Sequence, residues 1–137
     1  MSDVVLDTSA AIPFLLRSHE AHVEVRDHLA ERLPTLSGHS LAETYSVLTR
    51  LPGDARLAPD DAVTLLEARF ADPVLIDPET AASLPAVLAP LGIAGGAVYD
   101  ALVALAARQA DLPLATRDGR AAATYAALGV SVEHVAG

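Results

Sequence analysis

Short β-branched or apolar segments alternate along this chain with longer segments of helical periodicity. This alternation is typical of βαβ units, in which helices cover a mostly parallel sheet. The chain is therefore expected to adopt an α/β fold with a mostly parallel five-stranded sheet. The predicted strands are residues 3–7, 34–37, 74–77, 114–116 and 130–135.

About seven helices are predicted between these strands. The first begins directly after the first strand, with Thr8 and Ser9 as capping candidates, and Pro52-Gly53 ends the third. Right-handed crossovers would place the C-terminal ends of all strands at one edge, where open α/β sheets bind ligands. The helices are expected from residue 8 onward, at about 20–32, 40–51 and 59–71, from residue 78 onward, and at about 97–110 and 118–128.

The length of 137 residues and the 52% of apolar residues suit one globular domain, expected over residues 1–137. No segment approaches the roughly 20 apolar residues of a membrane span. The start has no basic region before an apolar one, and the chain contains no cysteine. Without a secretory signal or disulfides, a cytoplasmic protein is expected. The residues that interrupt the most apolar region are Pro85, Pro90, Gly92, Gly95 and Gly96.

The formal net charge of −9 argues against a protein that binds nucleic acid through a broad basic face. Any contact with a nucleic acid must then be local. All nine basic residues are arginines, which suit bidentate contacts with phosphate. The absence of lysine, together with abundant alanine, equally fits a bias in genome base composition.

Asp100 is the only charged residue in the segment 97–107, which is apolar on nearly all sides and predicts a buried helix. An ionised carboxylate there is costly unless it is paired or bound to a metal ion. Alternatively, Asp100 interacts with the helix dipole, because it lies in the first turn. Both interpretations are open for this residue alone.

Two further aspartates each follow a predicted strand. Asp7 ends the first strand, and Asp118 follows the strand at 114–116. Each could cap the helix that comes next. However, the shared edge of the sheet would bring the two carboxylates together, although 111 positions separate them in sequence.

Glu43 lies at the border of the apolar face of the helix at about 40–51. Taken alone, Glu43 is expected to be a solvated residue in the first turn of this helix. A functional role is favoured only by the presence of the other acidic residues. Several gathered carboxylates suit a hard divalent cation such as Mg²⁺. A cation held in this way can polarise a phosphoryl oxygen and activate water, so hydrolysis of a phosphodiester is the natural chemistry.

The acidic residues lie in four short motifs, none of which is specific alone. In this order, and over essentially the whole chain, they resemble a PIN domain. The segment 37–52, which contains Glu43, also resembles the VapC toxins of actinobacteria. The motifs are Val5-Leu6-Asp7-Thr8-Ser9-Ala10, Ala42-Glu43, Tyr99-Asp100-Ala101-Leu102 and Ala115-Thr116-Arg117-Asp118.

The resemblance implies a three-layer α/β/α sandwich and a Mg²⁺- or Mn²⁺-dependent endoribonuclease that leaves a 5′-phosphate and a 3′-hydroxyl. Asp7 and Asp100 would be the central metal ligands. Glu43 and Asp118 would complete the site partly through water, and Thr116 would orient a ligand or a water.

Proteins of this kind are usually dimers that a VapB-type antitoxin neutralises, often with a basic side chain near the acidic site. The implied function is therefore an RNA-cleaving toxin. A PIN-fold RNA-processing nuclease outside a toxin–antitoxin pair and a non-catalytic metal-binding PIN module are the alternatives.

Three arginines near these motifs are candidates for contacts with RNA phosphates. Arg117 and Arg120 flank Asp118, and Arg50 lies at the end of the helix that contains Glu43. The alternative is a set of solvated charges, on a loop or at a helix end where arginine suits the dipole.

His39 precedes Glu43 by four residues, so the two could share a helix face as ligands. Because a hard cation prefers oxygen, a structural or surface histidine is predicted instead. The three tyrosines are too scattered to predict a base-stacking platform.

Other classes of protein also place acids after parallel strands. Haloacid dehalogenase-type phosphatases and receiver domains rely on a lysine, which this chain lacks. Metal-dependent adhesion modules use Asp-x-Ser-x-Ser, and the segment 7–11 lacks the final serine. The segment 92–96 does not give the Gly-x-Gly-x-x-Gly pattern of dinucleotide-binding enzymes.

Overall fold

Helices separate the parallel strands in the computed structural model, which describes residues 2–136. The described strands are β1 (Val4–Leu6), β2 (Pro34–Leu36), β3 (Leu114–Thr116) and β4 (Val132–His134). The described α-helices are α1 (Thr8–Leu15), α2 (His22–Leu29), α3 (Gly38–Leu48), α4 (Pro59–Arg69), α5 (Pro78–Ala82), α6 (Leu84–Leu88), α7 (Ala97–Gln109) and α8 (Ala122–Ala127). Three short 3₁₀-helices, η1 (Gly53–Ala55), η2 (Ala89–Leu91) and η3 (Gly119–Ala121), complete the described elements.

The sheet has the strand order β2-β1-β3-β4, and every pair in it is parallel. Because successive side chains of a strand point to opposite faces, β1 contributes side chains to two separate hydrophobic cores. Val4 and Leu6 pack into one core, whereas Val5 packs into the other. The predicted α/β fold is therefore confirmed.

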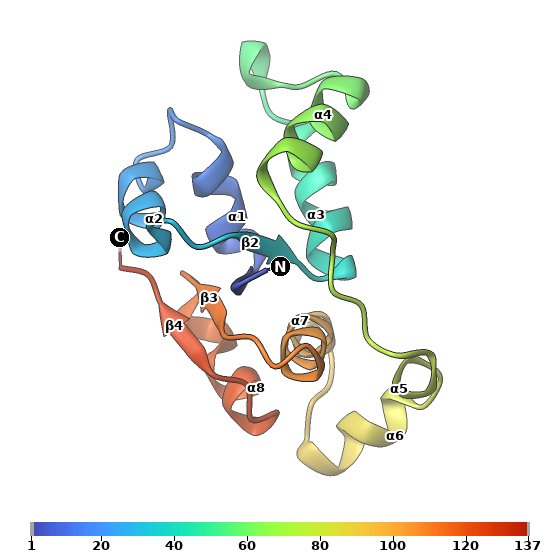
Figure 1. The fold of residues 1–137 in the computed structure, drawn as a ribbon. Coiled ribbons are helices and arrows are strands. Elements are labelled where there is room, and N and C mark those ends of the chain that lie inside the picture. The colour runs from blue at the N-terminus through green and yellow to red at the C-terminus, as the bar shows by residue number, and fades with distance from the viewer. Residues whose placement is uncertain (1, 137) are drawn as a thin grey trace.

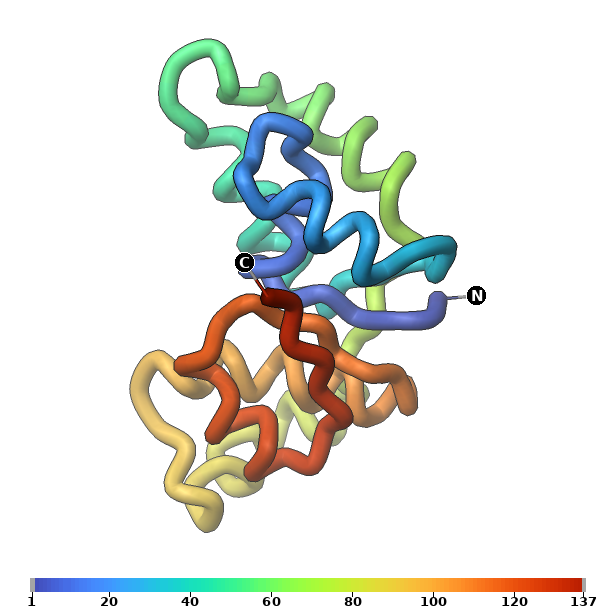
Figure 2. The backbone as a smooth tube through the Cα atoms, turned by 90° about the vertical axis from the view of Figure 1, so that its left-hand side faces the viewer, coloured from blue at the N-terminus to red at the C-terminus, as the bar shows by residue number. Residues whose placement is uncertain are grey.

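Helices cover both faces of the sheet and form a three-layer sandwich (Figure 1). The first core is closed by residues of α1 to α4, including Val25 and Leu48. The second core is closed mainly by α7 and α8, through side chains such as Leu105 and Tyr125. Turned by a right angle, the tube shows these helix groups on either side of the central strands (Figure 2).

The predicted fifth strand at 74–77 is wrong within the described residues, where Val74 forms only an isolated parallel bridge with Ser37. Val74 donates its N–H to the Leu36 carbonyl at 2.9 Å, and its own carbonyl accepts from Gly38 at 3.1 Å. Pro73 has no N–H to extend the pairing on one side. On the other side, Asp77 already caps α5, so the segment leaves the sheet after one residue.

The segments that follow β1, β2 and β3 meet at the C-terminal edge of the sheet. Asp7 follows β1 directly, and the loop after β3 contains Asp118. Helix α3 starts after β2, and it packs against both α1 and α7. This arrangement brings acidic side chains from separate segments to one edge of the sheet. Among residues 2–136, none of the helices combines the length and the hydropathy that crossing a membrane requires.

Candidate active site

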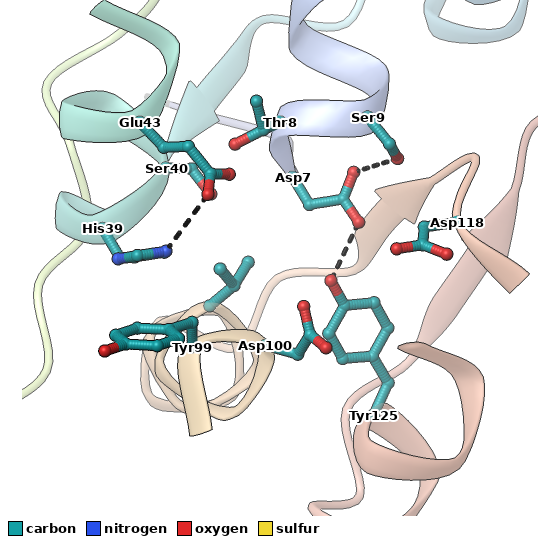
Figure 3. Close-up of a pocket in the computed structure, with 11 residues that line it drawn as sticks. Asp7, Thr8, Ser9, His39, Ser40, Glu43, Tyr99, Asp100, Asp118 and Tyr125 are labelled. Atoms are coloured by element: carbon teal, nitrogen blue, oxygen red, sulfur yellow. Dashed lines mark hydrogen bonds and ion pairs between the residues drawn. The ribbon is translucent and has the colours of Figure 1, made fainter. Parts of the chain in front are cut away.

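Four acidic side chains from four separate segments line one pocket at the C-terminal edge of the sheet (Figure 3). They are Asp7, Glu43, Asp100 and Asp118, the same four acids that the motifs single out. The meeting of Asp7 and Asp118 that the order of the strands predicts is therefore present, and Glu43 and Asp100 reach the same pocket from two helices.

Asp7 both caps a helix and faces the pocket. Its backbone is extended, and its Oδ1 accepts hydrogen bonds from the Ser9 hydroxyl at 2.6 Å and from the Ala10 N–H at 3.2 Å. Its Oδ2 accepts from the Tyr125 hydroxyl at 2.8 Å. The residue is only 5% exposed. Capping and a role in the site are therefore compatible at this position, because the carboxylate has lone pairs left for a further ligand.

The loop that carries Asp118 is tied to the loop that carries Asp7. Thr116 Oγ1 accepts from the Asp118 N–H at 3.0 Å and lies 3.3 Å from Ser9 Oγ. Because the single hydroxyl proton of Ser9 goes to Asp7, Thr116 must donate its own proton to Ser9. A chain of hydrogen bonds thus joins Asp7, Ser9, Thr116 and Asp118.

Asp100 projects from the first turn of α7 toward the other acids (Figure 3). Burial raises the pKa of its carboxyl, and the negative charges of Asp118, Asp7 and Glu43 raise it further. Arg120 acts in the opposite direction and has a smaller effect. The pocket therefore has an excess of negative charge.

Glu43 reaches the pocket from α3 and is the most solvated of the candidate ligands, with 46% of its side chain exposed. The Nε2 atom of His39, one turn earlier, lies 3.7 Å from Glu43 Oε2. The expected sharing of one helix face is therefore present.

Tyr125 is a residue of the pocket that the sequence analysis did not select. Its ring is buried in the second core, while its hydroxyl donates to Asp7. Burial and the charge of Asp7 raise the pKa of this hydroxyl, so it remains a proton donor. No local pattern in the sequence marks this tyrosine, because its partner lies 118 positions away.

The three candidate arginines differ in their placement. Arg120 is 94% exposed, and its Nε donates to Asp118 Oδ1 at 3.2 Å. Arg117 donates its backbone N–H to Ser9 at 2.8 Å, and its buried Nε has no partner among residues 2–136. Arg50 follows α3 about 10 Å beyond Glu43, since each helical residue rises about 1.5 Å, and it does not line the pocket.

The donor set of the pocket suits a hydrated divalent cation. The acids offer oxygen ligands of the kind that Mg²⁺ prefers. The buried hydroxyls of Thr8 and Ser40 also line the pocket, and within the described part of the chain they have no hydrogen-bond partner. No three Asp, Glu or His side chains of residues 2–136 are already arranged as a direct ligand set. The pocket therefore fits an ion that keeps several of its waters, with the free hydroxyls available to bind them.

Comparisons with known proteins show the family to which the chain belongs. A family model described as the PIN domain matches residues 4–127. Ribonuclease VapC27 of Mycobacterium tuberculosis is 58% identical over 129 residues, which are 94% of each chain.

Two solved structures are similar in fold. The M. tuberculosis toxin VapC20, described as cleaving the sarcin–ricin loop, has a TM-score of 0.68 at 17% identity, covering 93% of this chain and 96% of VapC20. VapBC-5, from a toxin–antitoxin system of M. tuberculosis, has a TM-score of 0.54 at 23% identity and covers 100% of both chains. From the family match and the identity to VapC27, the chain belongs to the PIN-domain family and, within it, to the VapC ribonucleases.

Proposed function

We propose that this protein is a divalent-metal-dependent endoribonuclease and the toxin of a toxin–antitoxin pair. The observation that carries the proposal is the gathering of Asp7, Glu43, Asp100 and Asp118 around one pocket. The identity of 58% to a ribonuclease, over 94% of the chain, supports the same activity. We infer that residues 1–137 act as one domain in the cytoplasm, where RNA is translated.

Asp7 and Asp100 would hold the ion, Mg²⁺ or Mn²⁺, and Glu43 and Asp118 would bind it partly through water. When bound, such an ion polarises the phosphoryl oxygen and lowers the pKa of water. Tyr125 and Ser9 keep the Asp7 carboxylate oriented by donating to its two oxygens.

We propose that the reaction is in-line attack of water on phosphorus with cleavage of the P–O3′ bond. The products would be a 5′-phosphate and a 3′-hydroxyl, as the resemblance to PIN-domain nucleases implies. Thr116 fixes the Asp118 loop relative to Asp7 and so sets the width of the site. Arg120 and Arg117 lie beside this loop, where they would guide the phosphates of the RNA. Arg50 is a weaker candidate for such contacts, because it lies outside the pocket.

A VapB-type antitoxin and a second copy of this chain are the protein partners that we infer. The similarity to VapBC-5, a member of a toxin–antitoxin family, supports the first partner. The excess negative charge around Asp100 also suits a basic side chain that would occupy the pocket in the neutralised complex.

The test is substitution of the two central acids. Asp7→Asn and Asp100→Asn should each abolish RNA cleavage while the protein remains folded, because asparagine keeps the shape of the side chain but not the charge that binds the ion. Cleavage is measured on total RNA with and without Mg²⁺, and folding by circular dichroism. Near-normal turnover in either variant would contradict the proposal.

Expression in cells separates the three possible roles. The chain is produced with and without the product of the adjacent gene, and RNA ends are mapped after growth arrest. A toxin cuts RNA and stops growth only when it is produced alone. An RNA-processing nuclease cuts in both cases, and a non-catalytic module cuts in neither.

A further inference from the structure

Two aromatic rings from different helices stack at the rim of the acidic pocket. His39 belongs to α3 and Tyr99 to α7, and their ring centroids lie 5.4 Å apart with an angle of 20° between the planes. Figure 3 shows the pair along one side of the pocket, with the tyrosine hydroxyl pointing away from the carboxylates. His39 lies 3.7 Å from Glu43, whereas Tyr99 forms no hydrogen bond with the acids among the described residues.

One face of the Tyr99 ring is open. The residue is 58% exposed although His39 covers one of its two faces, so the open area must lie on the other face and along the ring edge. His39 lies between Tyr99 and Glu43, since its Nε2 is 3.7 Å from Glu43 Oε2. The ring of Tyr99 is thus a largely exposed flat surface that lies next to a polar pocket and stacks on His39.

We propose that the open face of Tyr99 stacks on a nucleobase of single-stranded RNA whose phosphate lies at the acidic pocket. This inference rests on the proposed ribonuclease function and adds a binding residue to it. Every base offers a flat π face, so stacking on an aromatic ring tolerates different sequences. Because the contact needs no positive charge, it supplies affinity that a chain of net charge −9 does not gain from a basic surface.

The experiment compares Tyr99→Ala with Tyr99→Phe, which keeps the flat face. Every protein also carries Asp7→Asn, which is expected to abolish cleavage, so that binding is measured without cleavage. The probe is a short oligouridylate with 2-aminopurine at one position. Uridines stack weakly, so the free RNA is fluorescent and stacking on an aromatic ring quenches this fluorescence. Val23→Ala serves as the matched control, since Val23 is an exposed apolar side chain of α2 that does not line the pocket.

Tyr99→Ala should raise the Kd for this RNA by about 5- to 150-fold, the range that alanine substitution gives for one stacked base. It should also remove the quenching at one position of the probe. Tyr99→Phe and Val23→Ala should leave both unchanged. An RNA that is abasic at the same position should bind the Ala variant and the parent protein with equal Kd.

An unchanged Kd for the RNA in Tyr99→Ala would overturn the proposal. So would an equal loss of affinity for the parent protein whichever position of the RNA is made abasic. A variant that binds RNA normally but no longer binds the antitoxin would also overturn it and assign the ring to a protein partner. Failure of the ribonuclease function is a separate result, because the parent chain would then cut no RNA while the quenching still reports whether a base stacks.

Discussion

At the scale of single residues, the ionised carboxylate of Asp100 destabilises the folded protein. Burial and three neighbouring carboxylates raise the pKa of its carboxyl above 3.8, the usual value for Asp. The unfolded chain therefore releases this proton at a lower pH than the folded chain does. Protonated Asp100 contributes fully to stability when the pH is below the pKa that this carboxyl has in the unfolded chain. The contribution is lost as the pH rises through the higher pKa that the carboxyl has in the folded protein.

We therefore expect Asp100→Asn to raise the melting temperature at neutral pH when divalent ions are removed with a chelator. Added Mg²⁺ should stabilise the parent protein more than the variant, because only the parent keeps the full ligand set. Thermal unfolding from pH 4 to 7, with and without Mg²⁺, measures both effects.

Asp54→Asn, in the exposed 3₁₀-helix η1, is the control for the loss of one negative charge away from the pocket. A variant of Asp100 that melts below the parent protein at neutral pH, in the absence of ions, would show that repulsion in the pocket is not significant.

At the scale of elements, one carboxylate joins the end of the α2 segment to the edge strand β4. Both Glu133 oxygens accept from Arg32, at 2.9 and 3.0 Å, and Oε1 lies 2.7 Å from His28 Nε2. These hydrogen bonds, that from Arg32 above all, lower the pKa of Glu133 to about 2. The stability that Glu133 contributes is therefore present above pH 4.5 and lost as the pH falls toward 2.

Glu133→Gln should lower the free energy of unfolding by about 1–2 kcal/mol near neutral pH, the cost of losing charge-assisted hydrogen bonds at a partly exposed site. Near pH 2 the difference between the variant and the parent should shrink. Urea unfolding at both pH values measures the change. Glu24→Gln, on the exposed side of α2, is the control, and equal losses at both pH values would refute the role of the charge.

At the scale of the whole molecule, a net charge of −9 requires RNA binding to be local and dependent on cations. We expect weak binding that salt disrupts and that a chelator removes. If Arg120 contacts one phosphate, Arg120→Gln should weaken binding similarly for all sequences and should reduce the slope of log K against log salt by about one.

Fluorescence anisotropy with labelled RNA over a range of KCl concentrations measures this slope. Arg26→Gln, an exposed arginine of α2 outside the pocket, is the control and should leave the slope unchanged. Tight binding that persists in chelator and at high salt would refute this account of the electrostatics.

The strands of this chain, and the aspartates that follow two of them, could be predicted from the sequence. Short apolar or β-branched segments predicted all four strands. Burial on both faces explains this signal for β1, β2 and β3, whereas the edge strand β4 is only partly buried. The same order of strands predicted that Asp7 and Asp118 meet. The fifth strand was wrong because Val74 has the right side chain, but Pro73 and the cap at Asp77 leave room for only one bridge.

Only the tertiary structure decided which other side chains join the acids. Glu43 could be selected only because the other acidic residues had already been singled out. Tyr125 and the stack of His39 on Tyr99 were not predicted at all. Periodicity reports which way a residue faces within its own element, and that information is local. Whether the Tyr125 hydroxyl reaches a carboxylate 118 positions earlier depends on how α8 packs against the sheet, which no short segment of sequence encodes.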